Sequence, residues 1–250
     1  MKTNEKTDII HVLNKRVQLR QIPEGFRTSM DSVMLAAACP VKSGQSVLDL
    51  GCGVGSVGLC ILERVPDVNL TGIDIQQDHV EESWKNAALN GMESQAEFEC
   101  ADIRTLEMES FDHVVCNPPY FEAGAHIPSP SDSRAKAIGH LEQDLDLRDW
   151  VDCAFRHIKG QGSLTVIHTA GALDDILHSL YGSTGGKRFG AIEVFPLWPR
   201  EGAAAKRVIV RAWKHKKTPA TILPGLTLHT PEGQYTQAAD TVLRDAQVLF

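Results

Sequence analysis

The 250-residue sequence lacks the features that mark several large classes of protein. No apolar run approaches the ~20 residues that a membrane-spanning helix needs, and the start, MKTNEKTDII, has no apolar signal-peptide core. The six cysteines stand singly, with no CxxC pair and no histidine at metal-ligand spacing, so we expect packed thiols rather than disulfides or a metal site. These absences predict a cytoplasmic protein that binds no membrane and no metal.

Positive charge is also scarce. The 25 Lys and Arg against 32 Asp and Glu give a net charge of -7, which argues against a uniformly basic nucleic-acid binder, because phosphate contacts need local Lys and Arg. Residues 206–217 (KRVIVRAWKHKK) are the exception. They are either a nucleic-acid contact or an edge strand whose lysines prevent aggregation.

Short β-branched runs alternate with helical patterns along the chain. This order predicts an α/β, Rossmann-like fold with a mostly parallel sheet and helices on both faces. Only PREGAAAK separates the last two strands, so they form an antiparallel hairpin, and the sheet is expected to have one antiparallel strand. The seven expected strands are 46–50, 69–75, 96–101, 111–117, 163–168, 191–198 and 207–213.

A glycine-rich segment, LDLGCGVGSVGL, follows the first of these strands. A strand that enters a glycine turn and then a helix lets the backbone approach a ligand closely. Gly53, Gly55 and Gly58 fit the dinucleotide pattern GxGxxG, with Asp74 about 20 residues later. However, the first glycine after the strand is Gly51, and from there the spacing is GxGxG.

S-adenosylmethionine explains the acidic residues around this loop better than a dinucleotide does. Asp49 lies two residues before Gly51, where it would disfavour a pyrophosphate but attract the ammonium group of a methionine. Asp74 ends the second strand, where a carboxylate can accept hydrogen bonds from both ribose hydroxyls. The expected neighbours of the adenine follow the second and third strands and are Ile75, Asp102 and Ile103.

The fourth strand ends in a second motif, NPPY. Asn117 follows the strand, and because ligands bind at the carboxyl ends of strands in open α/β sheets, we expect it to face the crevice of the glycine loop and touch the cofactor. Pro118 and Pro119 stiffen the chain and leave carbonyl acceptors. The Asn117 side-chain oxygen and the Pro118 carbonyl could accept the two hydrogens of a planar amine, and Tyr120 could stack on a base.

In these motifs the sequence resembles the class I methyltransferases that modify planar amino groups, and more closely the bacterial tRNA1(Val) adenine-N6 methyltransferase family. The resemblance rests on GFRTSMDSVMLAAA, LDLGCGVGSVGL, GIDI, CADI, NPPYF, GAAAKRVIV and LHTPEGQYT. It implies S-adenosylmethionine as cofactor and tRNA as partner. It also implies that Ser29 or Asp31 bonds the methionine end of the cofactor. The implied cofactor contacts are Asp49, Gly51, Gly53, Gly55, Asp74 and Asp102, and the contacts to the target amine are Asn117, Pro118 and Tyr120.

The expected organisation is a single structural domain in three parts. Residues 1–45 form a β arm and a helix that close over the cofactor site, residues 46–215 form the methyltransferase core, and residues 216–250 form a C-terminal extension. The oligomeric state is left open.

Four alternative functions remain at this point, and one is a non-catalytic RNA-binding subunit of the same fold, against which the intact Asn117 and the unbroken glycine loop argue. The same NPPY chemistry serves methylation of a glutamine amide in a protein such as a release factor, or of another RNA or DNA base. A nicotinamide-dependent oxidoreductase would use the GxGxxG overlay but would leave NPPY unexplained.

Overall fold

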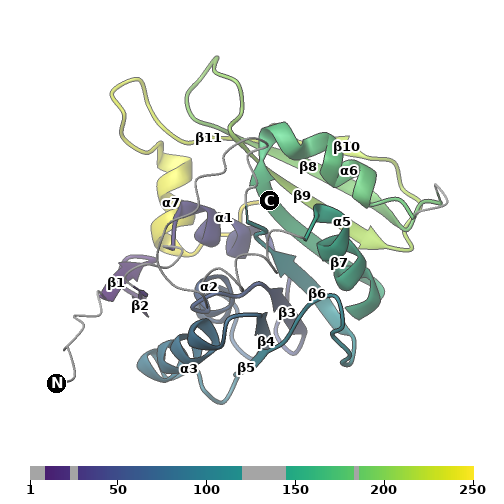
Figure 1. Cartoon of the computed structure of the whole chain (residues 1–250). Helices are drawn as coiled ribbons and strands as arrows, with labels where there is room; N and C mark the ends of the chain where they lie inside the picture. The colour runs from purple at the N-terminus through teal and green to yellow at the C-terminus, as the bar shows by residue number, and fades with distance from the viewer. Residues whose placement is uncertain (1–8, 23–27, 120–144, 183–185) are drawn as a thin grey trace, which may run out of the picture.

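The computed structural model describes residues 9–22, 28–119, 145–182 and 186–250. Within these residues a nine-stranded sheet carries helices on both faces, and a small hairpin of β1 and β2 lies beside it (Figure 1). The strands are β1 (Ile9–Val12), β2 (Val17–Arg20), β3 (Ser46–Leu50), β4 (Asn69–Asp74), β5 (Ala96–Cys100), β6 (Phe111–Cys116), β7 (Ile158–Thr169), β8 (Phe189–Trp198), β9 (Arg207–Lys214), β10 (Thr221–Ile222) and β11 (Leu226–Thr227). The helices are α1 (Met30–Ala38), α2 (Ser56–Arg64), α3 (Gln77–Asn90), α5 (Leu147–His157), α6 (Leu173–Ser179) and α7 (Gln237–Asp245), with a 3₁₀ turn at Ala170–Ala172.

The sheet has the strand order β10-β8-β9-β7-β6-β3-β4-β5, and β11 also pairs with β8. All seven expected strands form, and the mostly parallel Rossmann-like fold is confirmed. β9 is antiparallel to both β7 and β8, while the other long strands run in one direction. The two-residue strands β10 and β11 were not expected, because such short pairings carry no periodic signal.

The direction of chain winding reverses between β3 and β6. From β3 the chain proceeds through β4 to β5 on one side, whereas β6 and β7 lie on the other. Leu50, the last residue of β3, pairs with Cys116, the last residue of β6. The next residues, Gly51 and Asn117, therefore leave the sheet side by side at its switch point, where open α/β sheets bind ligands.

Two apolar layers fix the sheet between its helices. One joins buried side chains of α1, α2, α3 and α7 to one face, and the other joins α5 and α6 to the opposite face.

Within the described part of the chain, no helix is long and apolar enough to cross a membrane. Five of the cysteines are buried as free thiols and Cys100 is exposed.

The N-terminal hairpin is attached to the core by two asparagine side chains of α3. Asn86, fully buried, accepts a hydrogen bond from the Arg20 N–H (2.7 Å) and donates to the Arg20 carbonyl (3.1 Å) and to the Val54 carbonyl (2.9 Å). One turn later Asn90 accepts from the Gln18 N–H (2.9 Å) and donates to the Gln18 carbonyl (2.7 Å). The two amides therefore pair with alternate residues of β2 as a neighbouring strand would.

A carboxyl group lies inside the sheet at β3. Asp49 is 1% exposed and its Oδ2 accepts a hydrogen bond from the Gly58 N–H at 3.2 Å, which links β3 to the first turn of α2. Burial raises the pKa of Asp49 from 3.8 to about 7, and the nearby Asp74 adds to the rise. The folded protein therefore holds a proton on Asp49 at pH values where the unfolded chain has released it.

We expect Asp49→Asn to gain stability relative to the wild type as pH rises. Below about pH 4 both states of Asp49 are protonated, whereas between about pH 4 and 7 only the unfolded state ionises, which lowers wild-type stability. The difference should grow to a few kcal/mol, since one pKa unit corresponds to ~1.4 kcal/mol. Urea unfolding of the cofactor-free proteins at several pH values measures it.

Asp112→Asn is the matched control. Burial alone would raise the pKa of Asp112, but hydrogen bonds from Ser46 and the ion pair with Lys159 outweigh it and lower the pKa below 3.8. Its effect on stability should therefore be constant between about pH 5 and 7. A difference between Asp49→Asn and wild type that stays constant over that range would contradict the assignment.

Candidate active site at the switch point of the sheet

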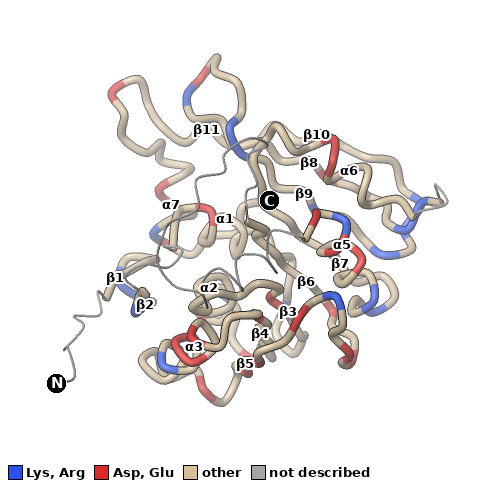
Figure 2. Tube along the Cα trace, viewed as in Figure 1, with Lys and Arg blue, Asp and Glu red and all other residues tan. Residues whose placement is uncertain are grey.

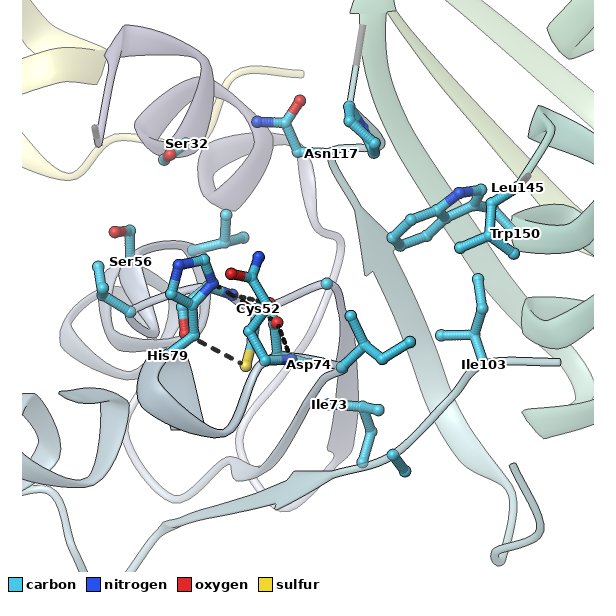
Figure 3. A pocket seen from close by; sticks show the side chains of 18 of the residues that line it. Ser32, Cys52, Ser56, Ile73, Asp74, His79, Ile103, Asn117, Leu145 and Trp150 are labelled. Carbon is cyan, nitrogen blue, oxygen red and sulfur yellow. Dashed lines mark hydrogen bonds and ion pairs between the residues drawn. The ribbon is translucent and has the colours of Figure 1, made fainter. Parts of the chain in front are cut away.

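A cavity opens where β3 and β6 end, and we call it the switch-point cavity (Figure 3). Its walls come from the glycine loop after β3, the ends of β4 and β5, the segment after β6 and the start of α5. Of the expected site residues, those that line it are Gly51, Gly53, Asp74, Ile75, Asp102, Ile103, Asn117 and Pro119.

The glycine loop can only be built from residues without a side chain at its key positions. Gly51, Gly53 and Gly55 have φ values of +68°, +54° and +84°, in the left-handed region that favours glycine. A Cβ on Gly51 would also lie 2.7 Å from the Trp150 ring. The N–H groups of Gly51 and Cys52 both donate to the Ile73 carbonyl, at 2.8 and 2.9 Å, so the loop is held against the end of β4.

Asp74 is the more buried of the two acids that line the cavity. It is 7% exposed, and its carboxylate accepts the Gly53 N–H on one oxygen and the Gln76 N–H on the other, each at 2.9 Å. His79, on the first turns of α3, brings its Nδ1 to 3.5 Å from Asp74 Oδ1 (Figure 3). The carboxylate is thus fixed in place by backbone donors, with unused lone pairs beside the cavity.

Asp102 follows the neighbouring strand β5 and is less enclosed than Asp74. Hydrogen bonds from the Arg104 guanidinium lower the pKa of Asp102, which also accepts the Arg104 N–H at 2.9 Å. Ile75 and Ile103 lie nearby in the same lining. An apolar slot with carboxylates at its sides suits a nucleoside, whose flat ring is apolar and whose edges carry donors.

The expected contacts at the start of α1 lie elsewhere. Ser29 caps the helix by accepting the Asp31 N–H at 3.2 Å, and Asp31 forms an ion pair with Arg207 at 2.9 Å. Neither is among the residues that line the cavity. Thr28 and Ser32 line it instead. The local signal for a helix cap is the same whether or not the cap faces a ligand, so sequence could not choose between these neighbours.

Thr28 is tied to the start of α2 and to the residue that follows β2. Its hydroxyl is hydrogen-bonded to that of Ser56 at the start of α2. Gln21 accepts a hydrogen bond from the Thr28 N–H at 2.8 Å and donates one to the Thr28 hydroxyl at 2.9 Å.

Two of the expected cofactor contacts, Asp49 and Gly55, lie beneath the residues that line the cavity. Asp49 bonds to Gly58, and Gly55 packs against Ser83 and Phe98.

The segment after β6 separates the switch-point cavity from a second cavity. Asn117 and Pro119 line the former, Pro118 and Pro119 line the latter, and Tyr120 lies outside the described residues. The rest of the second cavity comes from α5, α6 and the end of β7, including Arg148, His168 and His178. Burial lowers the pKa of His168 from its ordinary 6.5, which favours a neutral imidazole in this wall.

Trp150 stands between the two cavities and lines both. It is 6% exposed, and among the described residues its indole N–H has no hydrogen-bond partner. In Figure 3 the ring nitrogen lies on the edge away from Asp74. Trp150 recurs at helical spacing with Val151 and Ala154, a pattern that predicts packing in the core but does not reveal that the ring also lines a cavity.

Similarity to known proteins agrees with this site. The family model "Methyltransferase small domain" matches residues 27–144. The tRNA1(Val) (adenine(37)-N6)-methyltransferase of Shewanella sp. strain W3-18-1 is 27% identical over 238 residues, covering 92% of this chain and 96% of the relative. The enzyme of the same name from Shewanella baltica strain OS155 is 28% identical, over 88% of this chain and 92% of the relative.

Solved structures support the fold. A predicted O-methyltransferase from Agrobacterium tumefaciens superposes with a TM-score of 0.71 at 22% identity, covering 88% of this chain and 98% of that chain. A SAM-dependent O-methyltransferase from Thermotoga maritima gives 0.53 at 16% identity, covering 77% and 67%. At such identities the likeness concerns the architecture alone.

The nicotinamide alternative is not supported. A dinucleotide-binding sheet is parallel with order 3-2-1-4-5-6, whereas β9 here is inserted antiparallel between β7 and β8. The cavity instead offers a fixed carboxylate, apolar walls and a close backbone, which fit the ribose, adenine and methionine of S-adenosylmethionine. The chain is therefore similar over nearly its whole length to the bacterial tRNA1(Val) (adenine(37)-N6)-methyltransferases and has the fold of S-adenosylmethionine-dependent methyltransferases.

Proposed function

We propose that this protein methylates the exocyclic N6 amine of an adenine in tRNA, with adenosine 37 of tRNA(Val) as the expected target, and that it acts in the cytoplasm. The observation that carries the proposal is the pairing of Leu50 with Cys116, which brings the glycine loop and Asn117 into one cavity. The names of the similar Shewanella enzymes support this substrate.

The amine of adenine is a poor nucleophile, because its lone pair is delocalised into the ring. S-adenosylmethionine supplies a methyl group on a positively charged sulfur, which is already a strong electrophile. The task of the protein is thus to orient the amine. Asn117 and the Pro118 carbonyl would accept its two hydrogens, so that the nitrogen lone pair turns out of the ring plane, and fixed dipoles would stabilise the developing charge.

The position of the second cavity supports an acceptor site there. Pro118 and Pro119 form its border with the switch-point cavity, so a base in it would present its amine at the expected corner. The unpaired indole N–H of Trp150 would offer a donor to a ring nitrogen beside that amine. Tyr120, which we propose stacks on the base, follows directly in the sequence.

In the cofactor site we propose that Asp74 binds the ribose hydroxyls, with Gly51 and Gly53 giving the backbone close approach and Ile75, Asp102 and Ile103 surrounding the adenine. From beneath the glycine loop, Asp49 would attract the ammonium group of the methionine. Thr28 and Ser32 are better placed than Ser29 and Asp31 for the methionine end. The N-terminal segment 1–45 would then form one rim of the site.

The substrate is tested with methyl-labelled S-adenosylmethionine and either total tRNA or a release factor. After nucleoside digestion, the label should be found in N6-methyladenosine from tRNA. Label that appears only in the protein substrate, as a methylated glutamine, would contradict the proposal and favour the amide methyltransferase alternative.

Asn117→Ala should abolish turnover while leaving the cofactor site almost intact. Loss of a group that acts in the transition state should lower kcat by at least about 10²–10³-fold, with the Kd for S-adenosylhomocysteine changed only a few fold. Single-turnover kinetics and calorimetry separate the two. The exposed Asn69→Ala is the control and should leave both unchanged. A large loss of cofactor affinity in Asn117→Ala would contradict the role.

Asp74→Ala should have the reverse effect. Losing charge-assisted hydrogen bonds worth ~1.5–3 kcal/mol each should weaken cofactor binding by roughly 10- to 100-fold or more, while kcat at saturating cofactor changes little. Asp78→Ala, which removes an exposed carboxylate from the first turn of α3, is the matched control. Unchanged affinity in Asp74→Ala would remove the ribose contact from the proposal.

A further inference from the structure

The basic stretch 206–217 is divided by the strand that it forms. β9 runs antiparallel to β7, so its first residue, Arg207, pairs with Thr169 at the end of β7 where the switch-point cavity opens. Its last residues lie at the opposite end of the strands, where Lys214 pairs with Phe189 at the start of β8. We call this end of the strands the far edge and the other end the cavity edge. Eight residues of strand separate the two ends by roughly 25 Å.

The six cations of this stretch therefore do not form one surface. Three of them have structural partners: Arg207 pairs with Asp31, Arg211 with Glu193, and Lys214 donates to the Phe155 and Ile158 carbonyls. At the far edge Lys216 and Lys217 remain. At the cavity edge Lys206 is exposed, together with Arg200 from the same hairpin.

The β8–β9 hairpin is joined to the wall of the second cavity. The Ala170 N–H donates to the Lys206 carbonyl at 3.1 Å, two residues after His168, which lines that cavity. Among the described residues, the charged ends of Arg200 and Lys206 have no hydrogen-bond or ion-pair partner. Both cations are thus available to other partners on a hairpin that is hydrogen-bonded to the end of β7 beside the second cavity.

An aromatic pair stands beside this hairpin. Tyr235 and His229 stack with ring centroids 4.9 Å apart and 25° between their planes, and Tyr235 is 41% exposed. His229 Nδ1 donates to the Pro199 carbonyl at 3.2 Å, which fastens the C-terminal turn to the hairpin. Figure 1 shows the two loops projecting from the same side near β11, and Figure 2 shows basic residues on the hairpin and a separate group at the other end of β8 and β9.

We propose that Arg200, Lys206, His229 and Tyr235 form an RNA-docking surface, the hairpin surface, that holds the substrate strand next to its target nucleotide. This inference rests on the proposed function. The two cations would neutralise phosphates, and the exposed ring of Tyr235 would stack an unpaired base. Glu201 and Glu232 are also exposed in these two loops, so the RNA strand would be guided to the cations and the ring and kept from these carboxylates.

The test is the double charge reversal Arg200→Glu/Lys206→Glu, assayed with tRNA. Losing two phosphate contacts should raise the KM for tRNA at least about tenfold and reduce the slope of log KM against log salt by roughly 1.5–2. The kcat and the Kd for S-adenosylhomocysteine should stay within about threefold. Lys216→Glu/Lys217→Glu makes the same charge change at the opposite edge and should leave KM within about twofold.

Tyr235 is tested separately. Tyr235→Ala should raise the KM for tRNA about fivefold or more, because base stacking contributes ~1–3 kcal/mol. Tyr235→Phe keeps the aromatic ring and should leave the KM for tRNA near the wild-type value.

The surface is refuted if the far-edge pair raises KM as much as the hairpin pair, or if the hairpin pair has no effect on a wild-type enzyme that methylates tRNA. A wild-type enzyme that labels no tRNA under any condition would instead contradict the proposed function.

Discussion

The site depends on one register, the parallel pairing of β3 with β6 that ends at Leu50 and Cys116. Because the two strands end level, the glycine loop and the NPP segment begin at the same height on neighbouring strands. A register slip by one residue would turn every side chain of a strand to the other face of the sheet and destroy both apolar layers. The packing of the core therefore also enforces the geometry of the site.

Sequence predicted most of this arrangement because its signals were local. The loop Gly51–Gly55 has backbone conformations that favour glycine, and Asp74 ends a strand at a spacing set by one βαβ unit. What sequence did not find depended on contacts between distant segments. Trp150 has the spacing of a core residue and is also a cavity wall, because the start of α5 lies against the glycine loop after β3. The two-residue strands β10 and β11 had no pattern to read.

The start of α1 shows a limit of a different kind. Ser29, Asp31, Thr28 and Ser32 all have side chains suited to a polar ligand, and only the rotation of the helix decides which of them face the cavity. That rotation is set by the apolar contacts of α1 with its neighbours and by the ion pair of Asp31 with Arg207. The basic stretch 206–217 had the same ambiguity, since a charge count along the chain does not say at which end of a strand each charge stands.

The attachment of the N-terminal hairpin has a further consequence. Asn86 bonds the backbone of β2 and the glycine loop with a single amide, and Thr28 and Gln21 continue the same connection toward α2. Detachment of the hairpin would leave the buried amide of Asn86 without its two hydrogen bonds to Arg20, while its bond to the Val54 carbonyl would remain. Departure of the arm would therefore remove two of the hydrogen bonds that position the side chain supporting the loop, and we expect the loop to loosen when the arm opens.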